Sequence, residues 1–247
     1  MAKTAGIIVI GNEILSGRTP DENSIYLLRE LRSLGVDVRR VSVIPDEVTA
    51  IRDEVGTFSA QFDYVFTSGG VGPTHDDVTI AGIADAFNQG IRREPTLVVA
   101  LERYYQDALT EVMLRMANVP EEAVLVQSEE TLFPVVAVRN VYIFPGVPEI
   151  LRSKFDRIKE LFRQTPYHVL DVYLQVEEGE IANTLDEVLE AFPDLGLGSY
   201  PSLNNPVYKV KLTLESKDQE FLDQARRCLI EKLASRSIIP VAPPHPR

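Results

Sequence analysis

Apolar runs alternate with amphipathic stretches along the first part of the chain, and this alternation predicts repeated β-α units. Residues 6–10 form a short apolar run rich in β-branched residues, which is typical of a buried parallel strand. A helix is expected next, because Thr19-Pro20-Asp21-Glu22 has the pattern of a capping box with proline at the first helical position. This helix ends at Gly35 and presents four apolar residues on one face: Ile25, Leu28, Leu31 and Leu34.

The alternation continues to residue 163. Further strands are predicted at residues 38–44, 63–68 and 135–144, and helices after Asp46, after Asp77 and over residues 96–116 and 149–163. Alternating strands and helices favour a parallel sheet with helices on both faces. We therefore expect an α/β domain built on a mainly parallel, three-layer α/β/α sheet.

The pattern changes after residues 164–166, which have the composition of a linker. Strands are predicted at residues 168–176, 195–200 and 207–214, and helices at 180–192 and 218–234. This order predicts a small β-α-β-β-α domain of the α+β class. The expected organisation is an α/β domain at 1–165, a second domain at 166–241 and a flexible proline-rich tail at 242–247.

Acidic residues outnumber basic ones by 37 to 25, which gives a net charge of −12. Nucleic-acid binding needs a positive face, so no nucleic-acid partner is expected. An anionic small ligand is still compatible with this negative net charge, because backbone N–H groups and helix N-termini supply local positive potential. A single cysteine, Cys228, excludes an internal disulfide, and no apolar run approaches the roughly 18 residues of a membrane span. We expect a cytoplasmic homo-oligomer with no membrane partner.

Four strand-to-helix loops should gather at the carboxyl edge of the sheet, where ligands of parallel sheets bind: residues 11–17, 45–47, 69–77 and 145–149. The third, residues 69–77 (GGVGPTHDD), is called the glycine loop below. Gly69, Gly70 and Gly72 permit positive φ and close backbone approach, so successive N–H groups can point at a phosphate. The loop has neither a Walker A nor a dinucleotide fingerprint. The alternative is a tight turn that starts a helix, with Thr74 as its cap and Asp77 completing a capping box.

Asp76 and Asp77 lie beside these N–H groups, and adjacent carboxylates at a phosphate site are costly unless a cation balances them. A divalent metal such as Mg²⁺ or Mn²⁺ would do so, since it commonly joins carboxylates to substrate phosphates. Asp46 is a candidate for a further carboxylate, or else a helix N-cap. Glu13 is a weaker candidate, and His75 is either a ligand contact or a solvent-facing loop residue.

Lys209 and Lys211 share one face of a predicted strand in the second domain. They either meet a ligand phosphate or belong to a solvated strand face.

The chain resembles the molybdopterin-binding superfamily through the motifs at residues 11–15 (GNEIL), 45–47 (PDE), 69–79 (GGVGPTHDDVT) and 145–149 (PGVPE). Within that superfamily it is similar to the branch that contains the N-terminal domains of the CinA proteins and of eukaryotic FAD synthase. The similarity to FAD synthase is greater, because residues 139–146, 196–201 and 210–214 also share its motifs. Residues 127–134 depart from the glycine-containing segment of CinA proteins.

The resemblance implies a metal-dependent pyrophosphatase that cleaves the diphosphate of FAD, ADP-ribose or a related nucleotide and releases AMP. It implies catalytic and metal-binding roles for Asp46, Asp76 and Asp77, with Mg²⁺, Mn²⁺ or Co²⁺ as the metal. The departure at residues 127–134 leaves the choice of ADP-ribose open. Flavin adenylylation is not expected from this chain alone, because neither companion domain of those relatives is present in it.

The candidate site therefore combines the three aspartates with phosphate- and nucleotide-binding residues Gly11, Asn12, Glu13, Ser68, Gly69, Gly70, Gly72, Pro73, Thr74, Gly146, Lys209 and Lys211. The leading hypothesis is hydrolysis, in which the metal polarises the diphosphate bridge and a water attacks phosphorus. Two alternatives stay open. One is a catalytically silent nucleotide- or molybdopterin-binding domain, and the other is a molybdopterin adenylyltransferase-like enzyme.

Overall fold

The computed structural model describes residues 3–126, 133–233 and 238–239. The chain divides into two compact units, Met1–Thr165 and Pro166–Arg247. The tail predicted at 242–247 lies outside the described residues, as does most of the segment at 127–134. No helix in the described part of the chain is both long and apolar enough to span a bilayer.

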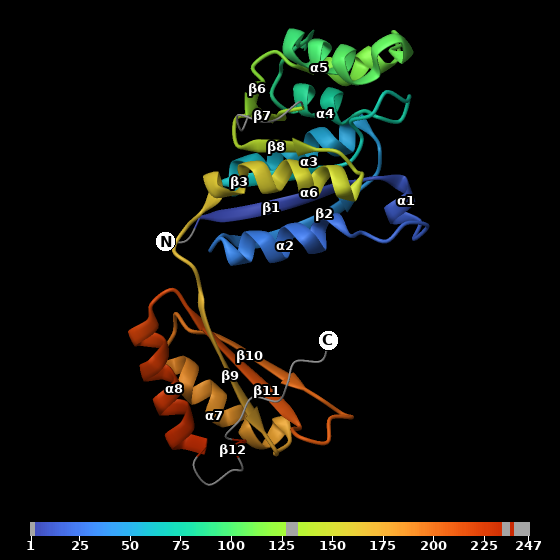
Figure 1. The fold of residues 1–247 in the computed structure, drawn as a ribbon. Helices are drawn as coiled ribbons and strands as arrows, with labels where there is room; N and C mark the ends of the chain where they lie inside the picture. The colour runs from blue at the N-terminus through green and yellow to red at the C-terminus, as the bar shows by residue number, and fades with distance from the viewer. Residues whose placement is uncertain (1–2, 127–132, 234–237, 240–247) are drawn as a thin grey trace. The chain divides into compact units, whose positions relative to one another are not determined.

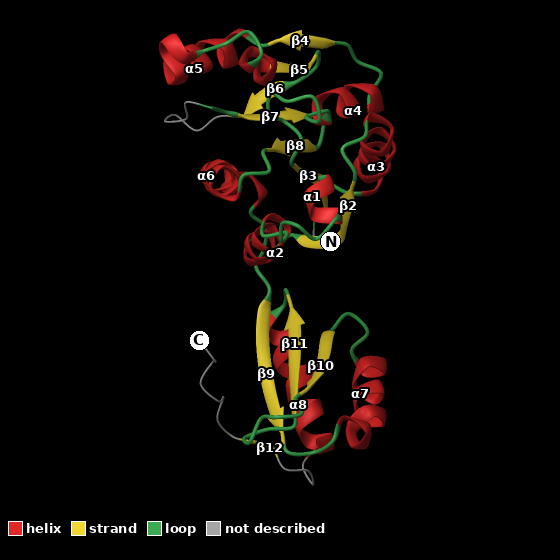
Figure 2. Ribbon diagram, turned by 90° about the vertical axis from the view of Figure 1, so that its right-hand side faces the viewer, coloured by secondary structure: helices red, strands yellow, loops and turns green. Residues whose placement is uncertain are grey.

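The first unit is a three-layer α/β/α structure around a six-stranded sheet of order β2-β1-β3-β8-β7-β6 (Figures 1 and 2). Its strands are β1 (Thr4–Ile10), β2 (Asp37–Ile44), β3 (Tyr64–Ser68), β6 (Val124–Val126), β7 (Val135–Val138) and β8 (Val141–Phe144). The first four in spatial order are parallel, and β7 and β6 are antiparallel to their neighbours. The mainly parallel α/β/α class predicted from the sequence is confirmed.

Helices cover both faces of this sheet. They are α1 (Asn12–Leu15), α2 (Asn23–Ser33), α3 (Val48–Gln61), α4 (Thr79–Ala86), α5 (Pro95–Tyr105) and α6 (Pro148–Ile158), with short 3₁₀ turns η1 (Gln106–Ala108), η2 (Met113–Ala117) and η3 (Lys159–Phe162). The alternation along β1 explains the two cores. Ile8 and Ile10 face α3, α4 and α5, whereas Ile7 and Val9 face α2 and α6.

Several sequence predictions about element boundaries were wrong. The strand expected at 135–144 is the β7–β8 hairpin, which turns at Arg139 with a φ of 53°. The helix expected over 96–116 ends at Tyr105, because Gln106 adopts a φ of 49°. Helix α2 begins at Asn23, and Asp21 accepts from Ser24 N at 3.0 Å. A small sheet of β4 (Ile91–Arg93) and β5 (Asn118–Pro120) was not predicted.

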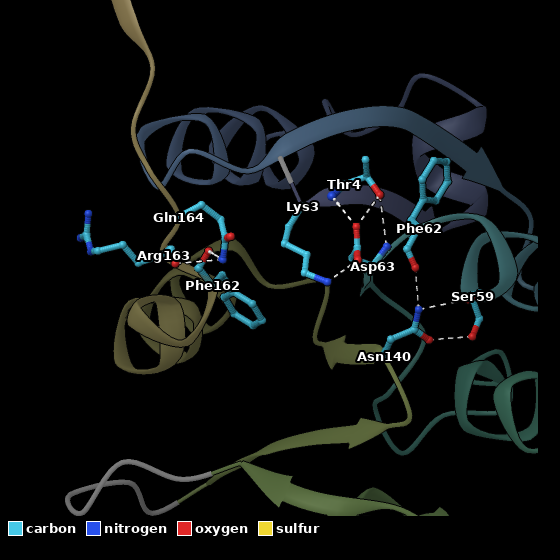
Figure 3. Close-up of polar contacts among 9 residues, drawn as sticks. All are labelled: Lys3, Thr4, Ser59, Phe62, Asp63, Asn140, Phe162, Arg163 and Gln164. Atoms are coloured by element: carbon cyan, nitrogen blue, oxygen red, sulfur yellow. Dashed lines mark hydrogen bonds and ion pairs between the residues drawn. The ribbon is translucent and has the colours of Figure 1, made fainter. Parts of the chain in front are cut away.

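Side-chain hydrogen bonds brace the amino ends of the strands (Figure 3). Asp63 accepts from Lys3 Nζ at 2.6 Å and from the backbone N–H of Thr4 at 2.8 Å, so it joins the starts of β1 and β3. Asn140 Nδ2 donates to the carbonyls of Ser59 at 3.1 Å and Phe62 at 2.8 Å, which joins the start of β8 to the end of α3. These bonds lie at the edge opposite the loops that carry the candidate chemistry.

The second unit is an antiparallel sheet of order β10-β11-β9-β12 with two helices packed against it. Its elements are β9 (His168–Leu174), α7 (Glu178–Ala191), β10 (Gly196–Pro201), β11 (Val210–Ser216), α8 (Gln219–Leu233) and β12 (Ile238–Ile239). Alternate residues of β9 and β11 enter one core with the apolar faces of α7 and α8. Cys228 is partly buried against that core.

Candidate functional site

The carboxyl ends of β1, β2, β3 and β8 bring the four predicted loops to one edge of the sheet. Gly11 N donates to the carbonyl of Ile44 at 3.1 Å, which joins the loops after β1 and β2. Gly69 N donates to the carbonyl of Phe144 at 3.1 Å, which joins those after β3 and β8. The chain runs from β1 to β2 on one side and later to β3 on the other, so β1 and β3 flank a topological switch point, where open α/β sheets bind ligands.

Asn23, at the start of α2, adds a link that sequence reasoning missed. Its Nδ2 donates to Ser68 Oγ at 2.8 Å and to the carbonyl of Gly146 at 2.7 Å, and its side chain is buried. Two predicted site residues from different loops are thus held by one amide. No repeat or motif marks Asn23 in the sequence.

The glycine loop takes its shape from two residues in the left-handed region of φ. Gly69 has a φ of 109° and Gly70 a φ of 65°. A Cβ on Gly69 would lie 2.1 Å from the carbonyl oxygen of Ile10, and one on Gly70 would lie 2.3 Å from Thr79 Oγ1. Both positions therefore require glycine, for conformation and for space. Gly72 has no positive φ, contrary to the sequence prediction, and a Cβ there would meet Asp77 Oδ2 at 2.6 Å.

The carboxylate of Asp77 holds this loop closed. Asp77 Oδ1 accepts from Gly72 N at 2.7 Å, and Asp77 Oδ2 accepts from Thr74 N at 2.8 Å and from Thr74 Oγ1 at 2.5 Å. Helix α4 begins later, at Thr79, and has no side-chain cap. The alternative in which Thr74 and Asp77 cap the following helix is therefore wrong, because both side chains are used within the loop.

Two successive backbone donors of the loop are left without acceptors. Within the described residues, neither Gly70 N nor Val71 N has a hydrogen-bond partner, whereas Gly69 N, Gly72 N and Thr74 N do. Consecutive N–H groups next to a left-handed residue form the concave arrangement that binds anions in proteins. The free pair is Gly70 and Val71, and not all three glycines as the sequence suggested.

Asp76 lies on the solvent side of the loop. Its side chain is 60% exposed, and its Oδ1 lies 2.6 Å from Thr74 Oγ1, whose single proton it shares with Asp77 Oδ2. The hydrogen bond from Thr74 and then one from the backbone of Asp76 itself lower the pKa of Asp76, with a smaller contribution from the charge of His75. His75 itself is 96% exposed with its Nδ1 3.9 Å from Asp76 Oδ1, and Pro73 lies between Gly72 and Thr74 at the partly buried side of the loop.

Asp46 has a different role from Asp77. Its Oδ2 accepts from the backbone N–H of Asn12 at 2.7 Å, whereas α3 has Glu47 at its N-cap position and no side-chain cap. The alternative in which Asp46 caps the helix is therefore wrong, and Asp46 ties the loop after β2 to the loop after β1. Glu13 is exposed on that loop, with its carboxylate beside Gly11.

The aspartates do not build a complete metal site by themselves. No three His, Cys, Asp or Glu residues in the described ranges group closely enough to hold a metal ion, so Asp46, Asp76 and Asp77 are not one ligand set. Mg²⁺ is often bound by one or two carboxylates and completes its coordination with waters and substrate phosphates. The oxygens of Asp76 and Asp77 beside an anion-binding loop fit that mode of binding.

A pocket of about 640 Å³ opens beside the glycine loop. Gly72, Thr74 and Asp77 form one part of its wall, and α5 contributes Tyr104 and Tyr105. Tyr104 packs edge-on against Tyr105 and Phe133, with ring centroids 4.9 Å and 5.7 Å apart. Apolar residues complete most of the remaining lining: Ile80, Ile91, Leu97, Leu101, Met116, Val136, Ile143 and Ile150. The loops after β1 and β2 do not line this pocket.

Two cations in the pocket wall were also missed by sequence reasoning. Arg115 comes from η2 and Lys154 from α6. Burial lowers the pKa of Lys154 to about 8. In the sequence both lie in helical stretches with charged residues on the solvent face, so no pattern separates them from surface charges.

Lys209 and Lys211 are each paired within their own unit. Lys209 Nζ lies 2.6 Å from Glu177 Oε1, and Lys211 Nζ lies 2.9 Å from Asp171 Oδ2. The hydrogen bonds to these carboxylates raise the pKa of both lysines.

Two family models match this chain. Residues 6–164 match the family described as probable molybdopterin binding domain, and residues 166–242 match the FAD synthase middle domain. A probable FAD synthase of Caenorhabditis briggsae is 34% identical over 96% of this chain and 50% of its own length, so the chain spans about half of that relative. A protein of Archaeoglobus fulgidus is 36% identical over 89% of this chain and 93% of its own length.

A solved structure is similar to about two thirds of this chain. CinA of Thermoplasma acidophilum, a protein with unknown function, is 30% identical with a TM-score of 0.60, and the match covers 66% of this chain and 100% of that one. Fold and site thus define an α/β protein whose glycine loop presents unpaired amides at the switch point of its sheet. The chain belongs to the probable molybdopterin binding domain family, and its second unit matches the family model described as FAD synthase, middle domain.

Proposed function

We propose that this chain is a metal-dependent pyrophosphatase that cleaves the diphosphate of FAD, ADP-ribose or a related nucleotide and releases AMP. One observation carries the proposal: the glycine loop holds the unpaired N–H groups of Gly70 and Val71, and Val71 lines a pocket whose other walls are largely aromatic and apolar. An anion site beside an aromatic pocket is complementary to a nucleotide, whose phosphates are charged and whose ring is planar and apolar.

The reaction adds water across the diphosphate. The water oxygen bonds to one phosphorus atom and the bond from that phosphorus to the bridging oxygen breaks. The bridging oxygen leaves with the other phosphate, a proton of the water passes to that phosphate or to solvent, and the two products are AMP and a second phosphate monoester. The amides of Gly70 and Val71 hold a non-bridging oxygen, where negative charge accumulates in the transition state. Asp77 keeps these amides in place by closing the loop, and Asp46 fixes the neighbouring loop through Asn12.

Asp76 and Asp77 are the residues that would hold a divalent ion together with the ligand phosphates. When bound, such an ion neutralises charge on the phosphate oxygens. Asp76, like any exposed aspartate, is ionised at neutral pH, and the hydrogen bond from Thr74 lowers its pKa further.

The experiment is a product assay with FAD and ADP-ribose and each of Mg²⁺, Mn²⁺ and Co²⁺. We expect AMP release with at least one metal and none after chelation. Asp76→Asn should raise the metal concentration needed for half-maximal rate, because it removes an exposed ligand and leaves Asp77 to hold the loop. Glu111→Gln, which neutralises an exposed carboxylate outside the pocket lining, serves as the matched control.

The lack of a three-carboxylate group in the described structure favours a second candidate, a nucleotide-binding domain without catalysis. The same assay separates the two functions. A domain that binds FAD or ADP-ribose in calorimetry but releases no AMP with any of the three metals is a binding domain, and the pyrophosphatase proposal is then wrong.

A further inference from the structure

The pocket carries a local positive charge inside an acidic protein. Its described lining has two side chains that are cationic at neutral pH, Arg115 and Lys154, against one carboxylate, Asp77, although the whole chain has a net charge of −12. Charges of one sign in a cleft with apolar walls concentrate the field on a ligand of the opposite sign. The part of the pocket beyond the glycine loop is therefore suited to an additional anionic group.

Lys154 is fixed at the same edge of the sheet as the glycine loop. Its Nζ donates to the carbonyls of Phe133 at 3.1 Å and Pro134 at 2.8 Å, just before β7 begins. Because Val136 pairs with Ile143 in the β7–β8 hairpin, Pro134 is level with the residue that follows Phe144. The carboxyl edge of β8 and the start of β7 thus coincide.

An ammonium group has three donors, and these two carbonyls use two of them. Lys154 forms no ion pair with any carboxylate in the part of the chain that the structure describes. A mostly buried ammonium without a counter-ion is costly, and an anion in the pocket would remove that cost. One N–H and a full charge are therefore available to a ligand.

The spacing between Lys154 and the loop selects the kind of anion. The loop follows β3, and Lys154 is bound at the start of β7, with β8 between them. Two strand spacings amount to roughly 10 Å. Charge-assisted hydrogen bonds take about 2.8 Å at each end. A gap of this order, roughly 4 Å, is wider than a single phosphate and comparable to two phosphates joined by one bridging oxygen.

We propose that Lys154 binds the second phosphate of a diphosphate whose first phosphate is held by Gly70 N and Val71 N. This inference rests on the proposed function and deepens it, since it makes Lys154 the residue that selects a nucleoside diphosphate over a monophosphate. Burial lowers the pKa of Lys154 to about 8, and an anion beside the ammonium would raise this pKa again because it favours the charged form.

The test compares the binding of ADP and AMP by calorimetry at pH 7 without metal. We expect the wild-type chain to bind ADP at least about tenfold more tightly than AMP, the equivalent of one charged contact. Lys154→Met should bring ADP affinity close to that of AMP and leave AMP within about threefold, and Lys154→Arg should keep the preference. Lys159→Met removes a charge near the end of the same helix, outside the pocket lining, and should behave as wild type.

The pH dependence of ADP affinity, measured as a pH series, separates phosphate binding by Lys154 from a purely structural role of this residue, which would give no such dependence. His75 and Asp77 of the loop, Tyr104 and Tyr105 of α5 and Arg115 of η2 also face the pocket, so the series is measured in a His75→Gln background. Between about pH 7 and pH 9, ADP affinity should fall as Lys154 loses its proton, by up to about tenfold per unit above its pKa, and should stay flat in Lys154→Arg.

Two results would overturn the inference. One is an unchanged ratio of ADP to AMP affinity in Lys154→Met with a normal thermal melt. The other is weaker binding of riboflavin in that variant with the ratio preserved, because Lys154 would then contact the ring and not a phosphate. Neither result depends on turnover, so this inference and the pyrophosphatase proposal fail separately.

Discussion

The carboxylate of Asp77 accepts the backbone N–H of Gly72 at 2.7 Å, and this bond ties the end of the glycine loop to its centre. The same carboxylate also accepts from Thr74, so the residue proposed to hold a metal is also the residue that shapes the loop. Structure and chemistry are therefore coupled at Asp77.

This coupling predicts that Asp77→Asn impairs both binding and turnover. Asparagine has one acceptor oxygen, so its amide N–H₂ would face either Gly72 N or the donors of Thr74, and the loop would open. We expect AMP release to fall by about 10² to 10³, the usual effect of losing one transition-state electrostatic group. The thermal melt should report a loss of about 1 kcal/mol.

Thr74→Val is the control for Asp77→Asn, because it removes only the hydroxyl and keeps both carboxylates. Its AMP release should stay within about tenfold of wild type, since Asp77 still accepts from Gly72 N and Thr74 N. Wild-type turnover in Asp77→Asn would contradict the role given to this residue.

Gly70→Ala should abolish nucleotide binding, because a Cβ at a φ of 65° is strained and would lie 2.3 Å from Thr79 Oγ1. Gly17→Ala is the matched control, since Gly17 has a φ of 70° with open space around it. Both variants should lose about 1 kcal/mol of stability from the backbone conformation, and Gly70→Ala should lose more because of its contact with Thr79. Only Gly70→Ala should lose affinity for ADP in calorimetry. If both variants lost the same ADP affinity, the loss would come from backbone strain alone and not from the site.

Combined replacement of Lys209 and Lys211 by alanine should leave nucleotide affinity at low salt within about twofold of wild type. Each lysine is already paired with a carboxylate, and a partly exposed pair contributes only about 0 to 1 kcal/mol to stability. This expectation favours the solvated strand face over the phosphate contact. A tenfold loss of ADP affinity with an unchanged melt would place the lysines in the ligand site.

Asp63 should contribute stability that depends on pH. Hydrogen bonds from Lys3 and Thr4 lower its pKa to about 2, below the value of about 3.9 expected in the unfolded chain. A depressed folded pKa gives stability that is complete above about pH 4 and lost as pH falls towards 2. The difference in unfolding free energy between wild type and Asp63→Asn should therefore shrink from pH 7 to pH 3 in urea titrations.

At pH 7 the cost of Asp63→Asn should be about 1 to 3 kcal/mol, as is usual for hydrogen bonds to a charged group. Figure 3 shows the contacts that Asp63→Asn would alter. Asp107→Asn provides the comparison, because Asp107 is exposed and makes no side-chain hydrogen bond among the described residues. A difference between wild type and Asp63→Asn that is constant with pH would show that Asp63 acts through its neutral hydrogen bonds alone.

The sequence alone determined the architecture and the place of the site. Apolar runs of strand length that alternate with amphipathic helices specify a parallel sheet. The strand pattern buries both faces of the sheet, whereas the helical pattern buries only one face of each helix. Gly69 and Gly70 were identified because only glycine tolerates their backbone conformation and close neighbours. The predicted loops meet at one edge, since parallel strands all end there.

Only the tertiary structure decided which of these groups are free to act. Asp46 binds Asn12 and does not cap a helix, because folding brings together two loops that are distant in sequence. Gly70 N, and not Gly72 N, is left for an anion, because Asp77 accepts from Gly72 N in the folded loop. Asn23 and Lys154 carry no local signal for the same reason. Their chemistry comes from carbonyls and side chains that folding brings to them, and a periodic pattern records burial but not the identity of a partner.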